Sequence, residues 1–166
     1  MWLYIDSPQH YLIENLCNCI GFLRGIQRIL EPEDSLVFSS WGSPPGIRAL
    51  LERHQLAPDE HVVQERRRLA GNDHYPDAFV VRWVAAPALL SQLADFLGTS
   101  FECSEFCDHI IAYGRRGALL SFHDAFQSDP LIVSGVIPES VIREFCEPFG
   151  VTYRLQDRKA FYDWSE

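Results

Sequence analysis

Two histidines and two aspartates lie at matching ends of two apolar segments that a short turn joins. Asp108 and His109 precede the segment IIAY, and His123 and Asp124 follow the segment ALLSF. A carboxylate can orient an imidazole for acid–base chemistry. Neighbouring residues of a strand point to opposite faces, so only a partner on the other strand can complete such a pair. These residue types therefore allow a His–Asp dyad only if Asp108 lies opposite His123.

The turn at 114–117 (GRRG) decides whether that pairing occurs. If its two glycines pair directly, Asp108 lies opposite His123, whereas one bulged residue places His109 there instead. Ser121 shares a face with His123, but no G-x-S-x-G motif surrounds it. We expect Asp108 and His123 to form a structural pair that braces the hairpin, and we assign no catalytic residue. The alternative is a small hydrolase-like enzyme that uses these two side chains.

Cysteine and histidine residues near the hairpin raise the question of a metal site. Cys103, Cys107 and His109 could supply three ligands to zinc, with His123 as the fourth. Their spacing matches no common short zinc-ligand motif, and a second cysteine pair does not follow. Buried free thiols and structural histidines explain the same residues. We therefore assign neither a metal nor a cofactor.

Acidic side chains dominate the charge of the chain, which has a formal net charge of −9. This balance disfavours nucleic acid as a direct ligand, and it favours either a basic protein partner or simply solubility. The region around the hairpin has a local acidic bias, and we predict that its carboxylates contact the partner. The predicted contact residues are Glu102, Glu105, Asp108, Asp124 and Asp129.

Length and composition predict one globular domain that spans residues 1–166. The chain is 47% hydrophobic and 22% charged, which is ordinary for a folded soluble protein. Its five cysteines show no disulfide-like spacing, and the N-terminus does not have the pattern of a signal peptide. No apolar run approaches the ~20 residues that a membrane span needs. We expect a cytoplasmic protein without a membrane contact.

Strand and helix patterns alternate along the first two thirds of the chain. We expect strands over 2–6, 35–41, 78–84, the two arms of the hairpin and 151–155. Helices are predicted over 9–30, 43–54, 86–97 and from Pro138 onward, and a further helix could begin near Pro58. This order favours a single α+β domain, with a mixed or antiparallel sheet of about six strands and helices packed mainly on one face.

The stretch LLSFHDAFQSDPLIVSGVIPESVIREFCEPFG, residues 119–150, carries a family resemblance. It resembles the C-terminal part of small acidic bacterial proteins of the toxin-immunity kind, in which a hairpin with a His-Asp-Ala-like corner precedes a helix that begins with proline. The resemblance implies a cytoplasmic protein that blocks a toxin, often a basic nuclease, through an acidic surface. It contains no diagnostic motif, so it assigns no functional residue.

Three hypotheses about function follow from the sequence. The first is a non-enzymatic binding protein, of the immunity kind, that neutralises a toxin by protein–protein binding. The second is the hydrolase-like enzyme that uses His123 and Asp108. The third is a homodimeric module that pairs through an exposed strand edge. Whether the chain is a monomer or a homodimer stays open.

Overall fold

The fold is an antiparallel sheet with its helices on one side. The computed structural model describes residues 5, 7–57, 77–82, 86–100, 107–127 and 129–157. Seven strands form one sheet in the order β3-β2-β4-β5-β6-β1-β7, and every ladder is antiparallel. The strands are β1 Gln9–Ile13, β2 Ser35–Ser40, β3 Asp77–Arg82, β4 His109–Gly114, β5 Gly117–His123, β6 Leu131–Ser134 and β7 Tyr153–Asp157.

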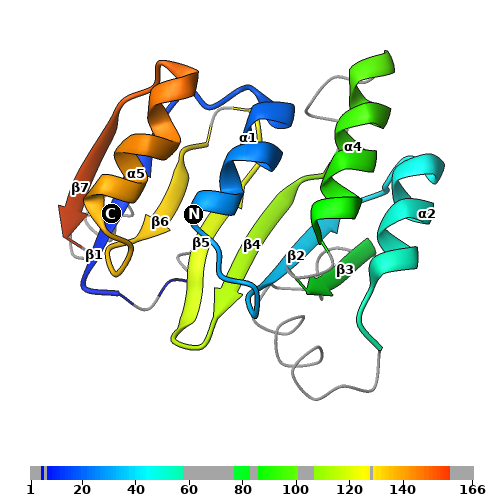
Figure 1. The fold of residues 1–166 in the computed structure, drawn as a ribbon, viewed down its shortest axis with the longest axis horizontal. Coiled ribbons are helices and arrows are strands. Elements are labelled where there is room, and N and C mark those ends of the chain that lie inside the picture. Colours follow the sequence, from blue (N-terminus) through cyan, green and yellow to red (C-terminus); the bar gives the residue numbers. More distant parts are fainter. Residues whose placement is uncertain are drawn as a thin grey trace.

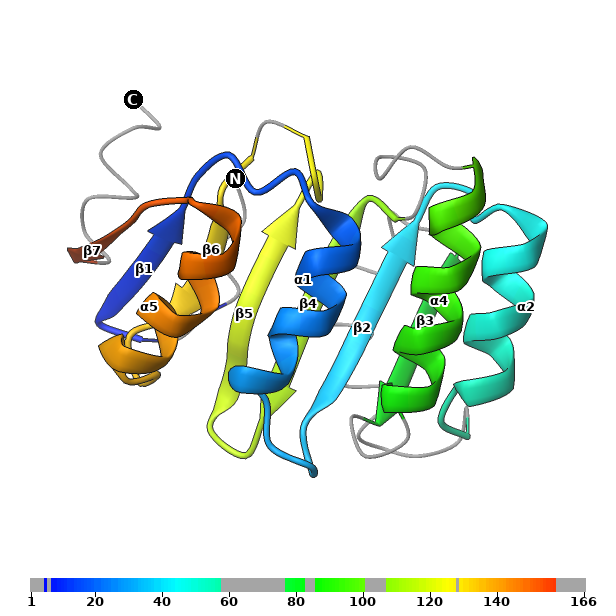
Figure 2. The same ribbon diagram turned by 45° about the horizontal axis from the view of Figure 1, so that its top comes forward.

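The helices cover the same face of this sheet, as Figures 1 and 2 show. The predicted α+β class, with helices mainly on one face, is therefore confirmed, and the described sheet has seven strands where about six were expected. The helices are α1 Cys19–Gly25, α2 Pro45–His54, α4 Ala86–Ser100 and α5 Glu139–Cys146, with short 3-10 turns η1 Ile26–Arg28 and η4 Glu147–Phe149.

The main core lies between the sheet and the helices. Phe22 of α1 is fully buried there, and its ring lies 5.7 Å from that of Phe122, 5.4 Å from that of Phe126 and 6.3 Å from that of Phe145. The opposite face of the sheet is also buried, with Val37, Val80, Ile111 and Ile132 among its apolar residues. Both faces of the central strands are therefore covered, so these strands are apolar on both sides.

The N-terminal helix predicted over 9–30 is wrong in its first half. Residues 9–13 form β1, which pairs with β6 and β7. Tyr11 and Ile13 face the helix-side core, and Leu12 packs on the opposite face. Because both faces are buried, the apolar run had no strand alternation and imitated a helical stripe. The helix begins only at Cys19, where the Asn18 side chain accepts a hydrogen bond of 2.8 Å from the Gly21 backbone N–H.

Other boundaries differ less from the expectations. The cap of α2 is Pro44, without a side-chain hydrogen bond, and not Ser43. Strand β7 begins and ends two residues later than predicted. The strand expected over 2–6 lies outside the described residues except for Ile5, and the helix expected near Pro58 lies wholly outside them.

The residue that follows β6, Gly135, lies close to the backbone of β1. The Gly135 backbone N–H donates a 2.8 Å hydrogen bond to the Gln9 carbonyl oxygen. A Cβ added to this glycine would lie 2.5 Å from the same oxygen. Only glycine fits this position without a shift of backbone atoms.

Candidate functional site

A β-bulge in the hairpin of β4 and β5 sets which polar residues meet. Gly114 pairs with Gly117, but the register shifts between Ala112, which lies opposite Leu120, and Tyr113, which lies opposite Ala118. Leu119 is the extra residue of the bulge. Because the side-chain period of a strand is two, this one residue changes every pairing beyond it.

The bulged register places His109, and not Asp108, opposite His123. The structural pair predicted for Asp108 and His123 is therefore wrong. The ring centroids of His109 and His123 lie 5.2 Å apart with an interplanar angle of 62°. The acid–base hypothesis loses its main support, because it required Asp108 to orient His123.

His109 is buried and has a strongly altered acidity. It is 1% exposed, and its Nε2 lies 3.2 Å from the Ser121 hydroxyl oxygen. Burial, and to a smaller extent the nearby charge of His123, lower the pKa of His109 to about 3. This imidazole is therefore neutral at physiological pH and a weak base, so a role in packing fits it better than general base catalysis.

His123 lies between two carboxylates at the exit of β5. Its Nδ1 is 3.5 Å from Asp124 Oδ1 and 3.4 Å from Asp129 Oδ2. The three side chains are 29%, 48% and 28% exposed, respectively. Strand alternation predicted that Asp124 would point away from its neighbour, but Asp124 has left the strand with φ of 42°. The strand rule does not apply to a residue in this turn conformation, and the contact forms.

Asp108 supports a different element, the end of β2. Its Oδ2 accepts a 2.8 Å hydrogen bond from the Trp41 backbone N–H, and its carbonyl oxygen accepts one of 3.0 Å from Ala125 N–H. Trp41 is 67% exposed. Asp108 thus connects an exposed aromatic residue to the turn that follows His123.

Of the predicted partner-contact residues, the structure brings three to this end of the sheet. They are Asp108, Asp124 and Asp129. We call these three residues and Trp41, whose backbone N–H is bonded to Asp108, the acidic end. Glu102 and Glu105 lie outside the described residues. Trp41 was not singled out from the sequence, where it was only the last residue of the strand expected over 35–41.

The zinc arrangement considered for the cysteines is not assembled by the described residues. Cys107 packs in the helix-side core, whereas His109 shares the opposite face of β4 with Ile111. Burial, followed by the nearby Cys19 and Asp108, raises the pKa of the Cys107 thiol well above its ordinary value. Cys103 lies outside the described residues.

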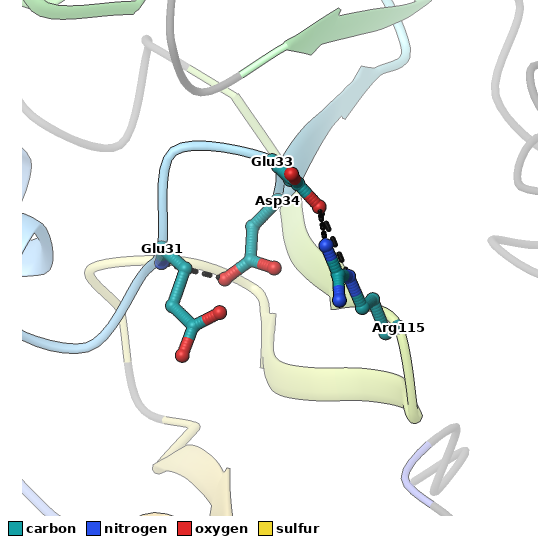
Figure 3. A network of polar contacts seen from close by, with 4 residues as sticks. All are labelled: Glu31, Glu33, Asp34 and Arg115. Atoms are coloured by element: carbon teal, nitrogen blue, oxygen red, sulfur yellow. Dashed lines mark hydrogen bonds and ion pairs between the residues drawn. The ribbon is translucent and has the colours of Figure 1, made fainter.

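A groove of about 540 Å³ lies at the turn end of the hairpin. Its apolar side chains include Leu119, Ile137 and Val141, and its rim is charged. Figure 3 shows part of this rim: Arg115 forms an ion pair with Glu33, and Asp34 Oδ2 accepts a 2.8 Å hydrogen bond from the Glu31 backbone N–H. At this rim, Glu33 therefore pairs with the charge of Arg115, and Asp34 accepts a bond from the backbone.

Comparison with known proteins finds no relative for this chain. Neither a protein-family model, a curated protein nor a solved structure matches it. The likeness to toxin-immunity proteins therefore stays a prediction. Among the described residues, no helix combines the length and apolar character needed to cross a membrane.

Proposed function

We propose that this chain is a non-enzymatic binding protein whose acidic end binds a basic protein partner. The observation that carries the proposal is Trp41, an exposed aromatic residue whose backbone N–H is bonded to the Asp108 carboxylate. Its backbone is held by Asp108, and Asp124 and Asp129 lie across the same end of the sheet. Tryptophan is enriched among the residues that dominate the binding energy of protein interfaces.

Charge supplies the second support for a basic partner. The net charge of −9 attracts cationic surfaces and speeds their encounter with the chain. The Asp124 side chain is 48% exposed, so a cationic side chain can reach it. Aromatic burial then gives the affinity, and the carboxylates around it give orientation and salt dependence.

The class of partner we propose is a basic toxin domain, which the chain neutralises in the cytoplasm as an immunity protein does. This proposal rests on the resemblance of residues 119–150 and on charge complementarity. It requires no chemistry of the chain itself. Inhibition by binding alone also agrees with a neutral, buried His109 and with an Asp108 carboxylate that supports a backbone N–H.

The test begins with retention of proteins from the source cell on the immobilised chain, at low and at high salt and with a chelator present. A retained basic protein is then purified, and its affinity is measured by calorimetry. Trp41→Ala should weaken binding by roughly 30-fold, the loss typical of a dominant interface residue. Leu155→Ala is the matched control, because Leu155 is also an exposed large apolar residue and lies on β7.

Two further results would decide the proposal. Co-expression of the chain with the partner should suppress the toxicity of the partner, and the Trp41→Ala variant should suppress it less. A partner whose binding is indifferent to salt and unchanged by Trp41→Ala would overturn the assignment of the acidic end. Retention of no basic protein would overturn the proposed class of partner.

A further inference from the structure

We propose that His123, Asp124 and Asp129 form a binding site for a divalent transition-metal ion, with Zn²⁺ as the best match. Each of the three residues offers one ligand atom, and these atoms all lie within 4.8 Å of one another. One imidazole nitrogen and two carboxylate oxygens are ligands that zinc accepts. The ligands come from the end of β5 and the segment that leads into β6, so the ion would join the two segments.

Two of the distances within the cluster match the spacing of ligand atoms around a shared ion. His123 Nδ1 lies 3.5 Å from Asp124 Oδ1 and 3.4 Å from Asp129 Oδ2. Hydrogen bonds from nitrogen to oxygen are usually about 2.7–3.2 Å long. In a tetrahedral zinc site with bonds of ~2.0–2.1 Å, two ligand atoms lie roughly 3.3–3.4 Å apart. Both observed separations are close to this ligand-to-ligand spacing.

The types of ligand select among metal ions. Ca²⁺ and Mg²⁺ bind almost wholly through oxygen, so a central imidazole nitrogen disfavours both. Two carboxylates and one neutral imidazole place two negative charges around the ion and match its double positive charge. Imidazole and carboxylate together suit zinc and its neighbours in the first transition row.

The three ligand residues are partly exposed, and neighbouring groups help to hold them in position. The three side chains are 28–48% exposed, so water can reach the cluster and complete the coordination of an ion. The His109 ring packs against the His123 ring at 5.2 Å and restricts its orientation. The Gln127 backbone N–H donates a 3.0 Å hydrogen bond to the Asp124 carbonyl oxygen, which supports the turn that carries this ligand. The imidazole and one carboxylate are therefore positioned without the ion.

The inference goes beyond the proposed function and does not depend on it, because it is tested on the isolated chain. The purified protein is treated with a chelator, dialysed and titrated with ZnCl₂ by calorimetry, and with CoCl₂ by visible absorption. We expect saturable binding of one equivalent and the absorption of tetrahedral Co²⁺. At a free Zn²⁺ concentration 100 times the Kd, the Tm should rise by about 5–10 °C. An equal concentration of Mg²⁺ should not compete.

Variants assign the ion to this cluster. Asp129→Asn should weaken Zn²⁺ binding at least tenfold, since an amide oxygen is a poorer ligand than a carboxylate. Asp95→Asn, which changes an exposed carboxylate on α4, is the matched control and should bind as the original protein does. Cys17→Ser removes the exposed cysteine as an accidental ligand and should also leave binding unchanged. Circular dichroism checks that each variant folds, and Asp124→Asn provides a second ligand variant.

Three results would overturn the proposal. The first is the absence of saturable Zn²⁺ binding at millimolar metal. The second is binding that Asp129→Asn and Asp124→Asn leave unchanged, which would place the ion elsewhere. The third is a combination of two results: Asp129→Asn changes the His123 proton resonances, and the original protein binds no metal. This combination would show that the two carboxylates only hold the histidine in place.

Discussion

Replacement of Phe22 by alanine should be among the most damaging single changes to this fold. Phe22 is fully buried, and its ring contacts those of Phe122, Phe126 and Phe145. It therefore joins α1 to the strand β5 and to α5. Helix α1 has only seven residues, too few to be stable alone, so its position depends on packing of this kind.

The expected cost follows from burial and from the cavity that the change leaves. Removal of a fully buried phenylalanine side chain costs about 3–5 kcal/mol, part of it from lost transfer free energy and part from the cavity. Three ring neighbours surround the site, so we expect about 4 kcal/mol. Natural domains have unfolding free energies of about 5–15 kcal/mol, so this loss would leave little stability. Phe22→Leu should cost about 1–2 kcal/mol, because leucine fills most of the space and loses the aromatic contacts.

Urea denaturation followed by circular dichroism measures these differences. The matched control is Arg24→Ala, an exposed residue of the same helix, which should change the unfolding free energy by less than about 0.5 kcal/mol. A loss below about 1.5 kcal/mol for Phe22→Ala would show that the aromatic cluster does not anchor α1. A loss equal to that of the control would refute the packing argument entirely.

Three further predictions concern the reactivity of cysteine thiols, the stability of the fold in acid and the space around two glycines. Burial raises the pKa of Cys146 to about 11, so iodoacetamide at pH 8 should label the exposed Cys17 much faster, as peptide mass spectrometry can show. The pKa of His109 is lowered to about 3 in the folded chain. Below pH 6.5 the unfolded chain therefore takes up a proton on this imidazole that the folded chain does not. The free energy of unfolding should fall by about 1 kcal/mol per pH unit as the pH drops from 6.5 toward 3. In urea titrations with a chelator present, His109→Gln should reduce this slope, and an unchanged slope would contradict the buried neutral imidazole. Gly135→Ala should cost about 1–3 kcal/mol in thermal unfolding because its Cβ meets a backbone carbonyl, whereas Gly98→Ala, with open space on α4, should be neutral or slightly stabilising.

The elements that local sequence encodes were predicted well. The segments β2 to β5, and the helices α2, α4 and α5, have apolar patterns bounded by proline, glycine or short polar residues. The turn at 114–117 carries glycine at both ends, and the structure pairs Gly114 with Gly117. Such signals act within a few residues, so they can be read from one chain without its partners in space.

Strand β1 and the hairpin register required the tertiary structure. Residues 9–13 become a strand because β6 and β7 lie on either side of them, and nothing in their own pattern excludes a helix. The bulge at Leu119 inverts the pairing beyond it, which separates Asp108 from His123. The bulged and the unbulged register contain the same residues in the same order, so the sequence alone did not distinguish between them.

Parts of the candidate sites could likewise be predicted from the sequence, and other parts required the tertiary structure. By itself, the sequence determined that carboxylates and histidines gather near the hairpin, with Asp124 and Asp129 in one short segment after it. Only the tertiary structure decided that both approach His123, and that Asp108 fixes the backbone beside an exposed Trp41. The reason is that Asp124 turns back with a positive φ and that β2 ends beside β4, and both depend on contacts between segments far apart in the chain.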